Sequence, residues 1–182
     1  MQSLERFTAV IAEAKKKHIP VRGYISCAFG CPYEGKMAES RVINLAEKLF
    51  ALGCYEISIG DTIGVATPLH AQHLFMKLSE KIPITCLAAH FHDTYGQALA
   101  NILAVLEIGV ATIDASVAGL GGCPYASGAS GNVAAEDVLY MLNGLGIKTG
   151  VDMAKLVAAG QFIYNFLDKK SLSKVALAWS KK

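Results

Sequence analysis

Four short segments rich in β-branched residues recur along the chain, and their spacing is the strongest constraint on its fold. They read VRGYISC at 21–27, YEISIGD at 55–61, ITCLAAHFH at 84–92 and ATIDASVAG at 111–119. Their starts lie about 30 residues apart, which is the length of one strand–helix unit. The segments are apolar enough to be buried in a parallel sheet.

Helix signals occupy the intervals between these segments. Thr67 and Pro68 form a helix start, and Gly53 and Gly109 are typical helix stops. The sequence therefore predicts an α/β chain made of one helix, four strand–helix units and a final helix. Apolar stripes place the predicted helices at about 1–18, 42–52, 68–79, 98–108, 132–146 and 152–167.

Two architectures suit this order of elements. One is an open sheet covered on both faces, and the other is half of a TIM barrel, whose eight units need about 250 residues. Polar clusters follow the strands at 60–61, 90–93 and 119–123, at the carboxyl edge where ligands bind in either fold. No GxGxxG motif opens a first strand–helix turn, so a dinucleotide-binding fold is disfavoured.

Composition excludes several classes of protein. The 182 residues carry a net charge of +2, which gives no reason to expect nucleic-acid binding, and no apolar run is long enough to span a membrane. The five cysteines form no paired knuckles, so a disulfide framework is not expected and a reducing compartment is favoured. Residues 1–18 resemble neither a secretory signal nor a transit peptide, which predicts a cytoplasmic protein.

The HFHD motif is the sharpest local signal for a site. His90 and His92 stand two residues apart on a strand and therefore point to the same face. Imidazole pairs bind several divalent metals, so a metal site is one interpretation. The alternative is a hydrogen-bond network with Asp93 that caps the next helix.

Two further polar residues have a structural and a functional interpretation. Asp61 ends the second strand, where it could be a base or simply the cap of a turn with Thr62. Asn132 could cap the following helix, or its amide oxygen could bind a hard cation.

The segment VAGLGGCPYASGASGN, which starts at Val117, places Cys123 among several glycines. A cysteine in a flexible loop at the active edge can be a reactive thiol or a proton donor, whereas the same residue can also be incidental to the loop. Cys27 and Cys31 have no second pair to complete a zinc site, so we interpret them as thiols at a strand end.

The motifs SVAGLGGCPYASGASGN, HFHDTYGQALAN, YEISIGDTIG and RGYISCAFGCPYEGK together resemble the 3-hydroxy-3-methylglutaryl-CoA lyases, over residues from about 21 to 163. The resemblance implies a TIM barrel that binds Mg²⁺ or Mn²⁺ and cleaves 3-hydroxy-3-methylglutaryl-CoA, an acyl-CoA substrate, to acetoacetate and acetyl-CoA. It implies His90, His92 and Asn132 as metal ligands. It further implies Cys123 as the catalytic thiol, Asp61 as the acidic residue near the reacting centre, and Tyr24 and Ser58 as pocket residues.

The resemblance also implies four further strand–helix units ahead of this sequence, with an arginine and an aspartate at the end of the first strand. Residues 1–20 contain no such pair at a strand end. We therefore interpret residues 1–182 as one partial TIM-barrel domain, the C-terminal half, and expect low activity from this chain alone. Its exposed strand edges predict pairing with a second copy or with a separate N-terminal half. The alternatives are a Claisen-type condensing synthase, which lacks the cysteine segment, and a non-catalytic remnant that binds a metal or a partner.

Overall fold

The computed structural model describes residues 2–122 and 131–179. Its main sheet contains four parallel strands in the order β1-β4-β5-β6, so strands that follow one another through a helix lie side by side. This order confirms the four predicted strand–helix units. The strands are β1 (Arg22–Ile25), β4 (Glu56–Asp61), β5 (Leu87–Phe91) and β6 (Thr112–Asp114).

The strands are shorter than the apolar segments that predict them. The segment at 84–92 begins with a short 3₁₀ turn, η1 (Ile84–Cys86), and only then becomes β5. The segment at 111–119 contains the three-residue strand β6 followed by a second 3₁₀ turn, η2 (Val117–Gly119). β-Branched composition therefore locates each strand, but the pairing of backbone groups sets its ends.

Helices fill the intervals as predicted. Helix α2 ends at Gly53, whose φ of 104° only glycine adopts readily, and α3 begins at Pro68 after Thr67. A small antiparallel hairpin, β2 (Gly30–Cys31) with β3 (Gly35–Lys36), and the last helix are additional to the prediction. The helices are α1 (Gln2–Lys16), α2 (Glu39–Leu52), α3 (Pro68–Ser79), α4 (Ala98–Leu106), α5 (Ala135–Gly144), α6 (Met153–Leu167) and α7 (Lys174–Trp179).

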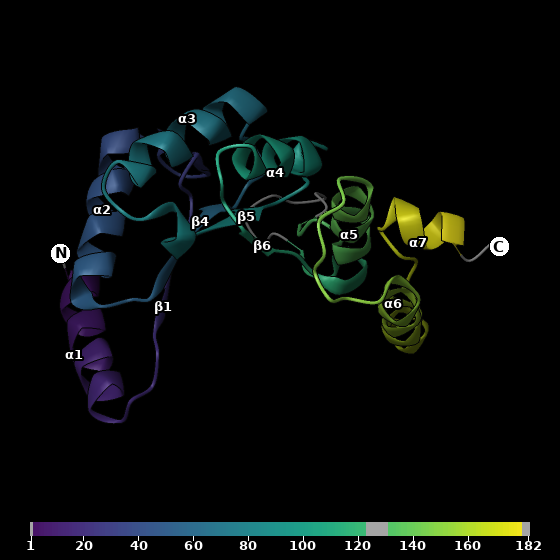
Figure 1. Cartoon of the computed structure of the whole chain (residues 1–182), viewed down its shortest axis with the longest axis horizontal. Coiled ribbons are helices and arrows are strands. Elements are labelled where there is room, and N and C mark those ends of the chain that lie inside the picture. Colours follow the sequence, from purple (N-terminus) through teal and green to yellow (C-terminus); the bar gives the residue numbers. More distant parts are fainter. Residues whose placement is uncertain (1, 123–130, 180–182) are drawn as a thin grey trace.

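The two faces of the sheet differ in chemistry because successive side chains along a strand alternate between them. Helices α2, α3 and α4 follow an arc along one side of the strands (Figure 1). The apolar strand residues facing these helices form the core, which includes Ile57, Ile59, Leu87, Ala89 and Phe91. In the part of the chain that the structure describes, no helix covers the opposite face in this view. This one-sided cover is that of half a barrel, and the open sheet covered on both faces is the wrong alternative.

No helix among the described residues is long and apolar enough to cross a membrane. The cytoplasmic location stays a prediction.

Candidate active site

The uncovered face of the sheet is lined by polar side chains from all four strands. Strand register places Tyr24 beside Ser58 and His90 beside Asp114, so these residues share that face. Tyr24, His90 and Asp114 border an open cavity of about 480 Å³, together with Ala115, Ser116 and Asn132. The polar residues of this face include Arg22, Tyr24, Glu56, Ser58, His90 and Asp114.

An ion pair joins the two edge strands across this face. The Arg22 guanidinium donates to both Asp114 carboxylate oxygens, with N–O distances of 3.1 and 2.9 Å. Arg22 also contacts the Glu56 carboxylate and the Tyr24 hydroxyl, and its Cζ lies 4.7 Å from the centre of the Tyr24 ring. The Ser58 hydroxyl donates to Asp114 Oδ2 at 2.7 Å. The result is one continuous network across the sheet.

This network keeps Asp114 ionised. Burial alone would favour the neutral acid, but His90, Arg22 and Ser58 outweigh it and hold the pKa of Asp114 well below its ordinary value. Burial likewise disfavours the charged guanidinium, yet Asp114 and Glu56 raise the pKa of Arg22. Both partners are therefore charged at neutral pH.

The two histidines of the HFHD motif lie next to each other. Their ring centroids are 5.2 Å apart, as the two-residue spacing predicts. Within residues 2–122 and 131–179, the Nδ1 atoms of both rings are buried and have no hydrogen-bond partner. Burial, together with the neighbouring His90, lowers the pKa of His92 and so favours the neutral imidazole. A neutral imidazole is the form that binds metals.

Asn132 comes to this pair from a distant part of the chain. It forms an isolated antiparallel bridge with His92, and the neighbouring Asp93 N–H donates to the Gly131 carbonyl at 2.8 Å. The Asn132 Nδ2 donates to the Leu120 carbonyl at 2.9 Å, which leaves Oδ1 to accept or to bind a cation. Asn132 is not the cap of α5, because that helix begins at Ala135.

The donor set of His90, His92 and Asn132 suits a divalent cation. Each imidazole can offer one ring nitrogen, and Asn132 can offer its amide oxygen. No group of three or more His, Cys, Asp or Glu side chains arranged to hold a metal ion is found within the described residues. The site as described therefore depends on the amide of Asn132 as its third donor.

Asp61 points away from this face. Its strand neighbour Gly60 pairs with His90, and Asp61 itself pairs with Phe91, which belongs to the apolar core. The Asp61 carboxylate is fully buried and accepts the Val65 and Ala66 N–H groups at 3.0 and 2.9 Å. Burial raises the pKa of Asp61, although these hydrogen bonds act to lower it. Asp61 reaches the histidines only through its backbone carbonyl, which accepts the His92 N–H at 3.3 Å.

Tyr24 and Ser58 lie on the polar face, as expected of pocket residues. Tyr24 is 60% exposed and stands at the open edge, whereas Ser58 is fully buried and hydrogen-bonds to Asp114.

The sequence motifs did not identify Arg22, Glu56 and Asp114 as residues of this site. Each is a charged residue inside an otherwise apolar strand, which is an unusual place for a charge. Arg22 and Glu56 stand two residues before Tyr24 and Ser58 and so share their face, and Asp114 pairs with His90 on the neighbouring strand.

Cys123 lies outside the described residues. The segment that leads to it is fixed at Ala118, which has a left-handed φ of 56°. The Ala118 N–H donates to both Glu136 carboxylate oxygens, at 3.0 and 2.8 Å, and the Tyr164 hydroxyl donates to its carbonyl at 3.1 Å. Both clamping side chains are buried, so the entry to the glycine-rich segment is held from two sides.

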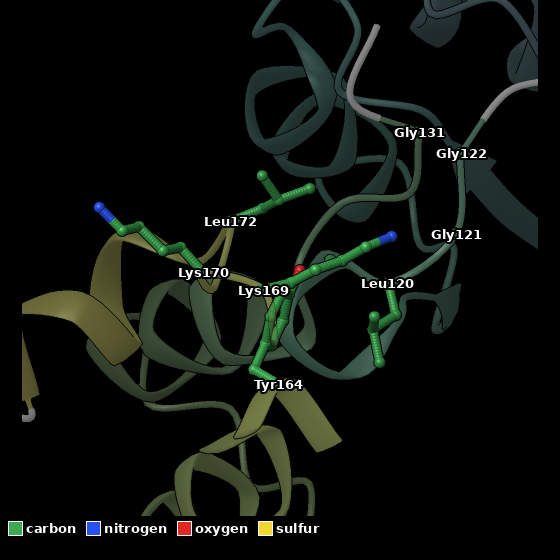
Figure 2. Close-up of a pocket in the computed structure, with 9 residues that line it drawn as sticks. Leu120, Gly121, Gly122, Gly131, Tyr164, Lys169, Lys170 and Leu172 are labelled. Atoms are coloured by element: carbon green, nitrogen blue, oxygen red, sulfur yellow. The ribbon is translucent and has the colours of Figure 1, made fainter. Parts of the chain in front are cut away.

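A pocket of about 380 Å³ adjoins this segment. Gly121 and Gly122 line one side, and Tyr164, Lys169 and Lys170 belong to its other side (Figure 2). In this view the Lys169 side chain extends toward the Gly121 segment, and Lys170 points the opposite way. The pocket therefore offers a cationic amine beside the stretch that continues to Cys123.

A parallel half-barrel with a histidine pair and an amide at the carboxyl edge of its strands defines a TIM-barrel protein with its site at the usual end. A hydroxymethylglutaryl-CoA lyase from Pseudomonas aeruginosa superimposes with a TM-score of 0.97 at 55% identity, covering 99% of this chain and 60% of that one. The HMGL-like family model matches residues 1–163, and the chain belongs to this family.

Two further relatives agree. The mitochondrial hydroxymethylglutaryl-CoA lyase of Mus musculus is 57% identical over 180 residues, which is 99% of this chain and 55% of the mouse protein. A lyase structure from Acinetobacter baumannii, in complex with coenzyme A and 3-methylmalate, has 36% identity and a TM-score of 0.91, covering 97% of this chain and 58% of that one. The chain thus spans somewhat more than half the length of these carbon–carbon lyases, and its fold is a partial TIM barrel.

Proposed function

We propose that this chain supplies the metal-holding and thiol-bearing part of a 3-hydroxy-3-methylglutaryl-CoA lyase, which releases acetoacetate and acetyl-CoA. The observation that carries the proposal is the meeting of His90, His92 and Asn132 at the carboxyl edge of the sheet, in a chain 57% identical to a lyase. A synthase of the same superfamily would share the histidines. The segment GLGGCPYASG, which contains Cys123, favours the lyase.

His90, His92 and Asn132 would hold Mg²⁺ or Mn²⁺, in keeping with the metal dependence of the lyase family. The close approach of the two imidazole rings and the backbone bridge that brings Asn132 to His92 support this assignment. A divalent cation supplies positive charge that stabilises an oxygen as it becomes negative.

The substrate would be an acyl-CoA. The Acinetobacter relative was solved with coenzyme A, and Lys169 and Lys170 line the pocket beside the glycine-rich segment. Lysine ammonium groups pair readily with phosphate. We therefore assign the phosphates of coenzyme A to this side of the site.

The reaction is a retro-Claisen cleavage. A general base takes the proton of the substrate's tertiary hydroxyl, the bond between C2 and C3 breaks, and C3 becomes the ketone of acetoacetate. The electron pair remains on C2 as a thioester enolate, which must gain a proton to become acetyl-CoA. Cys123 would donate that proton, because a thiol can act as a general acid toward an enolate carbon.

Asp61 would organise the site rather than take the proton itself. Its carboxylate holds the turn before α3 through Val65 and Ala66, and its carbonyl holds the His92 backbone. Tyr24 would face the substrate from the open edge, and Ser58 would support the network below it.

The test is acetoacetate release from 3-hydroxy-3-methylglutaryl-CoA with Mg²⁺. The purified chain is assayed alone and mixed with the part of the Pseudomonas aeruginosa lyase that it does not match. We expect release in at least one arm, and a loss of 10²-fold or more in the Cys123→Ala variant, which is the scale of a missing proton donor.

Cys86→Ala is the matched control, because Cys86 lies at the amino-terminal end of β5, at the far edge of the sheet. It should retain the activity of the parent chain. Absence of acetoacetate in both arms, or a condensation product in place of cleavage, would overturn the proposal.

A further inference from the structure

Asp114 occupies a fixed position beside one of the two histidines. It pairs with His90 in the register of β6 on β5, and its Oδ2 lies 3.6 Å from His90 Nδ1. That distance is just beyond the hydrogen-bond range, as is common for site contacts in unliganded proteins. Within the described residues no other group satisfies this buried nitrogen.

The carboxylate of Asp114 is held by three donors before any ligand arrives. Oδ1 accepts from Arg22, and Oδ2 accepts from both Arg22 and Ser58. Arg22 is in turn held by Glu56 and Tyr24. A carboxylate restrained in this way has little freedom to rotate, so its charge stays directed at the same part of the His90 ring.

We propose that Asp114 is a positioning residue that places the proton of neutral His90 on Nδ1 and so leaves Nε2 as the atom that binds the metal. A carboxylate facing one imidazole nitrogen selects the tautomer protonated there, which fixes the ring and raises the basicity of the other nitrogen. The inference rests on the proposed function only in taking His90 as a metal ligand.

The Arg22–Asp114 pair could instead serve stability alone. Ser58 distinguishes the two roles because, within the described residues, its hydroxyl hydrogen-bonds to Asp114 but to neither Arg22 nor His90. Ser58→Ala removes one restraint on the carboxylate and leaves the ion pair in place. A positioning role predicts a weaker metal site in this variant with little change in folding.

The first experiment observes the wild-type chain without metal. Long-range ¹H–¹⁵N NMR of the ¹⁵N-labelled chain at pH 8 reports which nitrogen of each histidine carries the proton, and the spectrum of His90→Ala assigns the signals. We expect a protonated Nδ1 and an unprotonated Nε2 on His90. A proton on Nε2 would overturn the inference, whatever the behaviour of any variant.

The second experiment measures Mn²⁺ affinity by electron paramagnetic resonance of the free ion. Asp114→Asn should weaken binding by 10–100-fold, the usual effect of removing such a partner, and Ser58→Ala should weaken it less. Asp152→Asn is the control because it keeps the helix cap of α6 far from the site. Circular dichroism checks that each variant folds.

The outcomes separate this inference from the proposed function. If His90→Ala binds Mn²⁺ as well as the wild type, the metal site of the proposed function is wrong. If binding depends on His90 but Asp114→Asn retains full affinity, the metal site stands and the positioning role of Asp114 is wrong.

Discussion

Arg22 and Asp114 stand on opposite edge strands of the sheet and still form a two-point ion pair, with N–O distances of 3.1 and 2.9 Å. Strands β4 and β5 lie between them. In a flat sheet three strand spacings would separate the two backbones by about 14 Å, so a direct contact requires the sheet to curl toward its polar face. The ion pair is therefore a marker of barrel curvature in this half of the fold.

Replacing Asp114 by Asn should destabilise the chain in a pH-dependent way. The substitution leaves Arg22 without its charged partner and should lower the free energy of unfolding by about 2 kcal/mol at pH 7. Because the pKa of Asp114 is lower in the folded than in the unfolded chain, its contribution is complete above the unfolded pKa of about 4. The contribution disappears as the pH falls below that value. Urea unfolding at pH 7, 5 and 3 should show the difference between parent and variant shrinking only at pH 3.

Replacing Asp61 by Asn tests the buried turn before α3. An asparagine side chain has one acceptor oxygen, so either Val65 or Ala66 must lose its hydrogen bond, and the amide nitrogen would face a donor. We expect a loss of about 1–3 kcal/mol in unfolding free energy. The same substitution at Asp152, an exposed helix cap, should cost almost nothing. Equal effects at both positions would refute this account of Asp61.

Replacing Gly160 by Ala should perturb the clamp on Ala118. A Cβ at this position of α6 would lie 2.7 Å from Glu136 Oε1 and 3.2 Å from the Ala118 Cβ. Overpacking of this kind costs about 1–3 kcal/mol, although alanine is the better helix former. Gly144→Ala, at the end of α5 with open space around it, is the matched control and should be neutral or slightly stabilising. Thermal unfolding of both variants compares the two directly.

Binding of Mn²⁺ should stabilise the folded chain. At a free Mn²⁺ concentration 100 times the dissociation constant, the gain in unfolding free energy is about 2.7 kcal/mol. Removal of the ion with a chelator should reverse it. His92→Ala should lose this response, whereas His73→Ala, a surface histidine that contacts Glu39, should keep it. A thermal shift that His92→Ala leaves unchanged would show that the ion binds elsewhere.

Local patterns in the sequence were sufficient for the order of elements and for one pair of site residues. The spacing of apolar segments predicted four strand–helix units, which the sheet order confirms. The period of two along a strand placed His90 and His92 on one face, and their rings do lie together. The order of elements and the shared face of the two histidines depend on residues close together in the sequence, so local sequence patterns determine them. The boundaries of the strands were less accurate, because they depend on pairing with distant residues.

Only the tertiary structure decided how the polar groups are connected. The curl of the sheet brings Arg22 to Asp114 across 92 positions of sequence, and a backbone bridge brings Asn132 to His92. Asp61 ends β4, the strand next to the histidines. The alternation of side chains along β4 nevertheless directs its carboxylate into the turn before α3, away from them. Side-chain direction, strand register and sheet curvature are set by the packing of the whole sheet, so no local pattern in the sequence contains them.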